Sequence, residues 1–210
     1  MALVSVSDIG GDVRLGLWRM DEEPGELLEL CPCLRLLDMP FTSLARQKEF
    51  LCVRALLVAM TGDEALRIEH NADGRPVAAG WQLSVSHTRG YAALMLSRKH
   101  AVGVDIEYRS DRIVRIASHF IRSDEEAVTA DEMLALWCAK ETLYKLHSDD
   151  HLQYAEMRLL GRMELPAFVG DGRMPASQPG LITIENMKRG ATVNVHVEAT
   201  SEYLLTWAVE

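Results

Sequence analysis

The stretch Val102-Gly103-Val104-Asp105-Ile106-Glu107 predicts a β-strand whose two faces differ in character. Side chains alternate across a strand, so Asp105 and Glu107 leave one face together. Val104 and Ile106 leave the opposite face and enter a hydrophobic core. The segment therefore predicts a sheet strand that presents two carboxylates on one side.

These two carboxylates indicate a cation site. Asp105 and Glu107 lie roughly 7 Å apart along the backbone, and they repel each other unless a positive charge lies between them. Mg²⁺ fits this pattern because it takes oxygen ligands and often uses one or two carboxylates together with substrate phosphates. The alternative is a solvated pair on an exposed sheet face, so this stretch alone does not decide between the two interpretations.

The chain before this strand predicts more β-structure. Residues 3–19 alternate loosely and indicate either an early strand or a hairpin around Gly10-Gly11. Residues 83–86 and 91–97 predict two further strands, and brief turns separate them from each other and from the acidic strand. Brief turns favour antiparallel pairing, since a parallel neighbour would need a long crossover.

One long helix is expected in this N-terminal part. Ser43 is a residue type favoured at the N-cap, and the helix is predicted to run to about Met60 and to end at Gly62. The preceding residues 21–29 are acidic and are expected to be solvated.

The C-terminal part predicts a helix followed by strands. Residues 123–126 have the pattern of a capping box that opens a helix to about His147, and a break in this helix near Ala130-Asp131 stays open. Residues 161–180 are rich in loop-forming types. Three further strands are expected at residues 181–185, 192–198 and 204–209. The predicted fold is α+β, with two lobes, 1–100 and 101–210, that each combine helices with a small antiparallel sheet.

Composition limits the classes of function. The chain has 210 residues, of which 48% are hydrophobic and 25% charged, as in ordinary globular proteins. The net charge of −9 argues against a nucleic-acid binder with a broad basic surface. No apolar run approaches the roughly 18–20 residues of a membrane span, and the N-terminus has no signal-peptide pattern. Four scattered cysteines do not predict a disulfide scaffold. We expect a cytoplasmic protein that binds neither nucleic acid nor membrane.

A second chemical pattern follows about thirty residues after the acidic strand. Trp137, Glu141 and Lys145 are spaced four residues apart, so they share one stripe of a helix. A tryptophan on that stripe indicates that it is partly buried. The alternative is an ordinary Glu–Lys helix pair, which stabilises a helix by about 0.2–0.5 kcal/mol.

Together, the two patterns resemble the paired signature of the 4′-phosphopantetheinyl transferases. V-G-V-D-I-E is similar to their acidic strand, and W-C-A-K-E-T-L-Y-K is similar to their catalytic helix. Three upstream segments resemble family motifs in the same order: Arg46 to Leu57, Gly74-Arg75-Pro76 and Ser84-Val85-Ser86-His87-Thr88. The resemblance covers residues 41–147 and is closest to the surfactin-type branch.

The resemblance implies a fold and a reaction. The surfactin-type branch has two pseudo-symmetric lobes, with coenzyme A in the cleft between them. Such an enzyme moves phosphopantetheine from coenzyme A to a serine of an apo acyl or peptidyl carrier protein, requires Mg²⁺ and releases 3′,5′-ADP. The implied N-terminal lobe contributes to coenzyme A binding, and the C-terminal lobe supplies the metal-binding strand and the catalytic helix.

The resemblance also implies a role for each matching residue. The implied metal ligands are Asp105, Glu107 and Glu141. The implied catalytic residues are Asp105, Glu141, Lys145 and His87. The implied coenzyme A contacts are Arg46, Arg54, Gly74, Arg75, Pro76, Ser86, His87 and Lys145. Glu141 would accept the serine proton either directly or through a metal-bound water, and both routes stay open.

The expected partners are coenzyme A and a carrier protein, with the enzyme acting as a monomer. Carrier proteins of such enzymes are usually acidic, so a chain of charge −9 would not attract them by net charge. We therefore expect an apolar docking patch and binding that changes little with salt. Two alternatives remain: another Mg²⁺-dependent phosphotransferase or nucleotide pyrophosphatase, and a non-catalytic relative that binds coenzyme A or a carrier.

Overall fold

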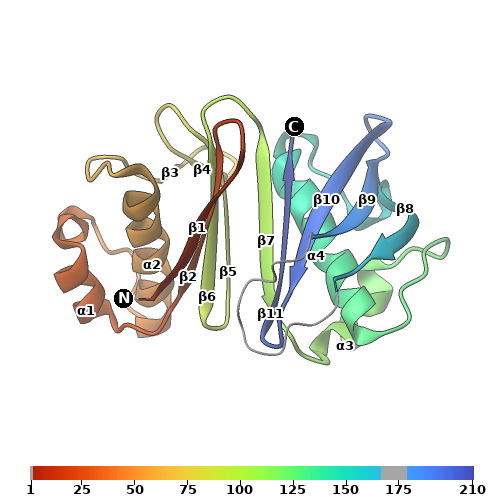
Figure 1. Ribbon diagram of the computed structural model, residues 1–210, viewed down its shortest axis with the longest axis horizontal. Helices are drawn as coiled ribbons and strands as arrows, with labels where there is room; N and C mark the ends of the chain where they lie inside the picture. The colour runs from red at the N-terminus through yellow and green to blue at the C-terminus, as the bar shows by residue number, and fades with distance from the viewer. Residues whose placement is uncertain (1, 167–178) are drawn as a thin grey trace. The chain divides into compact units, whose positions relative to one another are not determined.

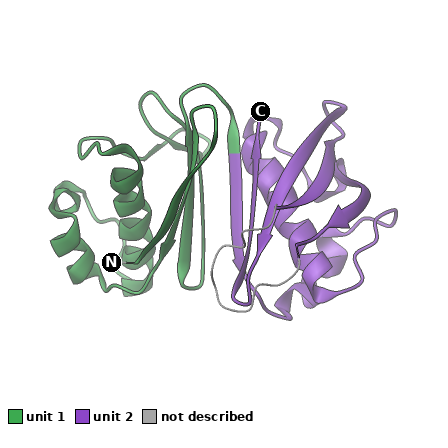
Figure 2. Cartoon of the chain, in the orientation of Figure 1, with its two compact units in different colours: residues 1–102 green, residues 103–210 purple. Residues whose placement is uncertain are grey.

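The computed structural model describes residues 2–166 and 179–210. Contacts divide the chain into two compact units, Met1–Val102 and Gly103–Glu210 (Figures 1 and 2). In each unit helices accompany antiparallel strands, so the predicted α+β class is confirmed. No helix within the described residues is both long enough and apolar enough to cross a membrane.

Unit 1 is built on a four-stranded sheet in the order β1-β2-β6-β5. The predicted hairpin and the two predicted strands after it are confirmed, and every neighbouring pair in this sheet is antiparallel. The strands are β1 (Leu3–Gly10), β2 (Val13–Arg19), β5 (Gln82–Thr88) and β6 (Tyr91–Ser97). Two shorter strands, β3 (Glu69–His70) and β4 (Pro76–Val77), pair separately.

The helices of unit 1 lie on one face of this sheet (Figure 1). They are α1 (Pro24–Leu30), the 3₁₀ helix η1 (Pro32–Leu36) and α2 (Leu44–Thr61). The prediction for α2 is confirmed, with Ser43 at its N-cap and Gly62 at its C-cap. Gly16 of β2 permits close packing, because a Cβ there would lie 2.5 Å from the Met60 sulfur and 2.8 Å from a Leu56 methyl.

The expectation of a solvated acidic stretch at residues 21–29 is wrong in part. This segment forms α1, and its Leu27 is fully buried in the core of unit 1. The acidic residues assist the helix, because Glu23 and Glu26 form a capping box at its start. Glu22 is buried and accepts hydrogen bonds from the Ala2 backbone at 2.6 Å and from the Trp18 indole at 3.2 Å.

Unit 2 contains a five-stranded sheet in the order β7-β11-β10-β9-β8. Its strands are β7 (Val102–Tyr108), β8 (Met157–Glu164), β9 (Gly180–Asn186), β10 (Ala191–Ala199) and β11 (Tyr203–Val209). The three predicted C-terminal strands are confirmed. The predicted pairing of the acidic strand with its predecessors is wrong: β7 is hydrogen-bonded to β11, about a hundred residues later, and is not a strand of the sheet that contains β5 and β6. Of the expected loop-rich region 161–180, residues 161–164 belong to β8, and residues 167–178 lie outside the described residues.

The described residues of unit 2 also form two α-helices, α3 (Arg112–Phe120) and α4 (Ala130–Leu146). α4 packs against the sheet, mainly against β11 (Figure 1). The predicted capping box at residues 123–126 is wrong, since α4 begins later with a box formed by Thr129 and Glu132. The reason is that Glu125 turns inward, where its carboxylate accepts hydrogen bonds from Lys140 at 2.7 Å and from the Leu159 backbone at 2.7 Å.

Two short 3₁₀ helices follow α4. They are η2 (Ser148–Asp150) and η3 (Tyr154–Glu156). The acidic segment containing η2 is neutralised within unit 2, because Asp150 accepts from Arg189 and Asn186 and its backbone accepts from Lys188. These contacts give Asp150 a structural role.

Candidate functional site

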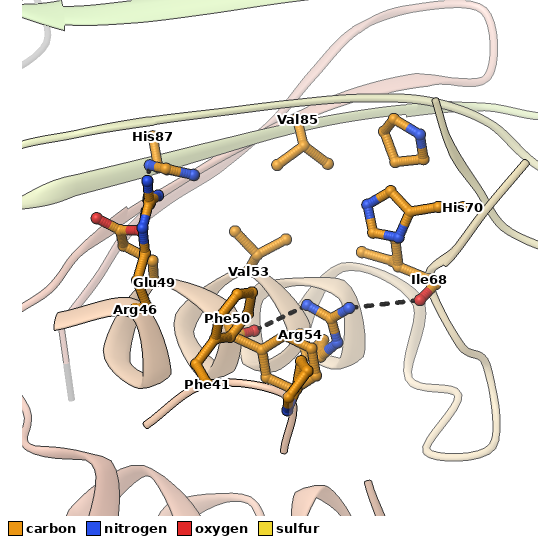
Figure 3. Close-up of a pocket in the computed structure, with 12 residues that line it drawn as sticks. Phe41, Arg46, Glu49, Phe50, Val53, Arg54, Ile68, His70, Val85 and His87 are labelled. Atoms are coloured by element: carbon orange, nitrogen blue, oxygen red, sulfur yellow. Dashed lines mark hydrogen bonds and ion pairs between the residues drawn. The ribbon is translucent and has the colours of Figure 1, made fainter. Parts of the chain in front are cut away.

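Unit 1 contains a pocket of about 360 Å³ (Figure 3). The α2 positions 46, 49, 50, 53 and 54 share one helical face, and Val85 and His87 share one face of β5. The pocket is lined by Pro40, Phe41, Arg46, Glu49, Phe50, Val53, Arg54, Ile68, His70, Pro76, Val85 and His87. Of the predicted coenzyme contacts, it brings together Arg46, Arg54, Pro76 and His87.

One end of this pocket is polar. Arg46, Glu49 and His87 gather there (Figure 3). Arg46 donates a hydrogen bond to Glu49 Oε2 at 2.8 Å, and His87 Nδ1 lies 3.8 Å from the same oxygen. Both predicted phosphate contacts at this end thus lie close to one carboxylate. Sequence reasoning missed Glu49, although its position three residues after Arg46 places it on the same side of the helix.

The other end of the pocket combines an arginine with aromatic rings. The Arg54 guanidinium lies over the Phe50 ring, 3.4 Å from its centroid, and donates to the Phe50 and Ile68 carbonyls at 3.1 and 3.4 Å (Figure 3). Burial lowers the pKa of Arg54 to about 10. Phe41 meets Phe50 edge to face at 5.9 Å. A half-buried cation beside flat rings suits a ligand with both an anionic group and an aromatic base.

Four predicted coenzyme contacts are absent from the described lining of this pocket: Gly74, Arg75, Ser86 and Lys145, of which Lys145 belongs to unit 2. Gly74 and Arg75 belong to a turn in which both backbone N–H groups donate to Asn71, at 3.0 and 2.9 Å. Ser86 is buried, and strand alternation turns its side chain away from the face that carries Val85 and His87. Their predicted roles therefore depend on contacts beyond this pocket.

Unit 2 holds the predicted acidic cluster, which forms where α4 approaches β7. A Cβ on Gly103 would lie 2.5 Å from the Thr142 carbonyl oxygen, so only glycine permits this approach. Gly103, Asp105 and Glu107 alternate onto the same side of β7. Because Gly103 packs closely against α4, the side of β7 that bears Asp105 and Glu107 faces this helix.

Lys145 is the partner that α4 offers to Asp105. Its ammonium donates to Asp105 Oδ1 at 2.7 Å and to the Val104 carbonyl at 3.0 Å. Only 6% of the Asp105 side chain is exposed, so this ion pair is well shielded from water. The acidic strand β7 and the Glu141–Lys145 stripe of α4 are thus in direct contact, through Lys145 and Asp105.

Glu141 lies within electrostatic reach of the same pair. Burial raises the pKa of Glu141, the hydrogen bond from Tyr154 lowers it, Asp105 raises it and Lys145 lowers it. The Tyr154 hydroxyl donates to Glu141 Oε1 at 2.6 Å. Sequence reasoning missed Tyr154, because nothing in the intervening residues predicts that the chain returns to α4 at this point.

Glu107 lies at the far end of β7, where it is half-buried and lines a pocket of about 240 Å³ that Trp137 also lines. Cys138 of α4 is fully buried: burial raises the pKa of its thiol, and the charges of Asp105 and Glu107 and a hydrogen bond with Asp105 raise it further. Both strand carboxylates are therefore close enough to Cys138 of α4 to raise the pKa of its thiol.

These residues fit a divalent ion in donor type and charge. Asp105, Glu107 and Glu141 supply carboxylate oxygens, the ligands that Mg²⁺ prefers. Three carboxylates and the Lys145 ammonium together carry two net negative charges, which a divalent cation would balance. Within the described residues, no group of three or more His, Cys, Asp or Glu side chains is gathered closely enough to hold a metal, and Asp105 and Glu141 bond to Lys145 and Tyr154 instead.

The fold and these two sites define an α+β protein with an arginine- and histidine-lined pocket in one unit and a buried acid–lysine cluster in the other. A comparison with protein-family models found no match, and a comparison with curated proteins found none either.

Proposed function

We propose that the chain is a cytoplasmic, monomeric 4′-phosphopantetheinyl transferase of the two-lobed, pseudo-symmetric surfactin-type branch. It transfers phosphopantetheine from coenzyme A to a serine of an apo carrier protein in a Mg²⁺-dependent reaction and releases 3′,5′-ADP. The observation that carries this proposal is the cluster of Asp105, Lys145 and Glu141, in which a strand and a helix distant in sequence place two acids and a lysine together.

In this proposal Glu141 accepts the proton of the carrier serine. Its raised pKa suits that role, because a carboxylate is a stronger base when its pKa lies closer to neutrality. Lys145 supplies positive charge beside the reacting diphosphate, where it stabilises the departing 3′,5′-ADP. Asp105 holds the Lys145 ammonium at 2.7 Å and so orients it.

Asp105, Glu107 and Glu141 are the residues that would hold Mg²⁺. When bound, the ion would offset the charge of the diphosphate oxygens. The chain's own contribution is a shielded set of oxygen donors on the rigid pair of β7 and α4.

The unit 1 pocket is the proposed site of the nucleotide end of coenzyme A. Arg46 and His87 at its polar end offer hydrogen-bond donors to the 3′-phosphate, and Arg54 adds positive charge at the other end. Phe41 and Phe50 provide apolar surface for the adenine. This pocket supports a coenzyme A substrate over a simple phosphate ester.

The direct test is mass spectrometry of a panel of apo carriers incubated with the chain, coenzyme A and Mg²⁺. One carrier should gain the mass of one phosphopantetheine group while 3′,5′-ADP appears. Asp105→Ala and Glu141→Ala should each lower the rate by about 100- to 1,000-fold, because each removes charge stabilisation or the base. Chelation of Mg²⁺ should abolish transfer, and added Mg²⁺ should restore it.

Glu126→Ala is the matched control, because Glu126 is an exposed acidic residue of the same unit. It should transfer at the wild-type rate. Cleavage of coenzyme A without carrier modification would favour a pyrophosphatase instead. Coenzyme A binding with neither cleavage nor transfer would favour a non-catalytic relative, and a fully active Glu141→Ala variant would refute the assigned mechanism.

A further inference from the structure

Tyr154 makes a short hydrogen bond to the proposed base. Its hydroxyl donates to Glu141 Oε1 at 2.6 Å, a distance typical of bonds to an ionised carboxylate. Tyr154 begins η3, thirteen residues after Glu141, so the bond ties the chain that follows α4 back to the helix. It belongs to none of the family-like motifs in the sequence.

The ring of Tyr154 is itself fixed by aromatic packing. It lies tilted against Trp137 with ring centroids 5.2 Å apart, and it meets Phe120 edge-on at 6.4 Å. Phe120 also meets Trp137 edge-on at 5.1 Å. The backbone is held as well, because Gln153 and Glu156 form a capping box around η3. The hydroxyl is therefore presented from a rigid support.

Glu141 needs such a partner. The terminal torsion of a glutamate is broad, so packing alone does not orient its carboxylate. The nearby charge of Asp105 repels Glu141, and the Lys145 ammonium donates to Asp105. Tyr154 thus supplies the hydrogen bond that counters this repulsion and sets the direction of Glu141.

We propose that Tyr154 is a positioning residue that holds the Glu141 carboxylate in its working orientation. This inference rests on the proposed function, in which Glu141 binds the metal and accepts the serine proton. Groups that orient metal ligands by hydrogen bonding typically change metal affinity or activity by about 10- to 100-fold when they are lost.

The test is Tyr154→Phe, which keeps the ring and removes the hydroxyl. We expect kcat to fall by about 10- to 100-fold while KM for coenzyme A stays within about twofold, because the nucleotide pocket is untouched. In a separate measurement without coenzyme A or carrier, Mn²⁺ titration followed by electron paramagnetic resonance should show a Kd about tenfold weaker than that of the wild type. Circular dichroism checks that the variant is folded.

Tyr144→Phe is the matched control, since Tyr144 lines the same pocket of about 330 Å³ as Glu141 and Tyr154. It should leave kcat and Mn²⁺ affinity unchanged. An unchanged kcat or an unchanged Mn²⁺ Kd in Tyr154→Phe would overturn the inference, and so would an equal loss in Tyr144→Phe. If the wild type modifies no carrier, the proposed function fails, while the Mn²⁺ comparison still decides whether Tyr154 orients Glu141.

Discussion

Arg46 and His87 both lie close to the carboxylate of Glu49 at the polar end of the unit 1 pocket. A 3′-phosphate bound there would share these two groups with a carboxylate of the same sign. Like charges at short range weaken binding, although the exposure of Arg46 limits the effect because water screens the charges. Glu49 is therefore expected to reduce the affinity for coenzyme A.

Replacing Glu49 by glutamine should strengthen the recognition of the 3′-phosphate. We expect Glu49→Gln to lower KM for coenzyme A by about two- to fivefold, a small effect in keeping with a partly exposed charge pair. Dephospho-coenzyme A, which lacks the 3′-phosphate, is the control substrate, and its KM should not change. Steady-state kinetics with both substrates measures this, and equal gains for both would contradict the assigned position of the phosphate.

Glu198 of β10 predicts a pH-dependent stability. Burial raises its pKa from 4.5 to about 7, and its Oε2 is buried with no hydrogen-bond partner within the described residues. Because the folded state holds this proton more tightly than the unfolded state, the contribution of Glu198 to stability is fully present below about pH 4.5. It is lost as the pH rises through about 7.

Glu198→Gln should remove this loss. At about pH 8 the variant should exceed the wild type by about 1–3 kcal/mol, and near pH 5 the difference should largely vanish. For a chain of this length, each kcal/mol corresponds to a Tm shift of about 2–4 °C. Thermal unfolding followed at both pH values tests this, and a Tm difference independent of pH would show that Glu198 ionises normally.

Among the elements, α4 places successive residues into different environments. Consecutive residues on a helix point about 100° apart, so Lys140 and Glu141 face different surroundings. Lys140 is fully buried and donates to the Phe120 carbonyl and to Glu125, both at 2.7 Å. Glu141 instead points to Tyr154. The buried ion pair fixes the loop before α4, while the proposed function assigns the next residue, Glu141, to catalysis.

β7 and α4 pack closely because residue 103 is a glycine. At Gly103 the helix backbone comes so close that a Cβ would meet the Thr142 carbonyl. Further along, Lys145 bonds to Asp105 and to the Val104 carbonyl. The glycine that begins the G-V-D-I-E stretch thus sets the distance at which the acids and the lysine can interact.

For the whole molecule, the charge of −9 opposes the approach of an acidic carrier protein. Under the proposed function, α3 is expected to counter this locally, because it exposes Arg112 and Arg115. Salt screens both the long-range repulsion and the local attraction, so the two effects offset each other.

Carrier modification should therefore depend weakly on salt. Between about 50 and about 300 mM NaCl we expect KM for the carrier to change by less than about threefold. In the double variant Arg112→Gln/Arg115→Gln only the repulsion remains, so its KM should be higher at low salt and should fall as salt is added. A wild-type KM that rises steeply with salt would show instead that attraction dominates.

Local patterns in the sequence were sufficient for much of the fold. The first hairpin, α2 and the last three strands were predicted because turn glycines, caps and side-chain alternation act over a few residues. The pairing of β7 with β11 was not predictable in this way, since it depends on which distant strand completes the sheet. The inward turn of Glu125 was likewise hidden, because its partner Lys140 lies on the far side of a loop.

The same division holds for the sites. Chemical types and spacing in the sequence singled out Asp105, Glu107, Glu141 and Lys145, since a strand and a helix each display regularly spaced residues on one face. Only tertiary packing decided that Lys145 donates to Asp105 and that Tyr154 donates to Glu141. It also decided that Arg46, which lines the unit 1 pocket, donates to Glu49. Such contacts join residues through space, and their energies depend on burial and distance, which no local pattern of residues encodes.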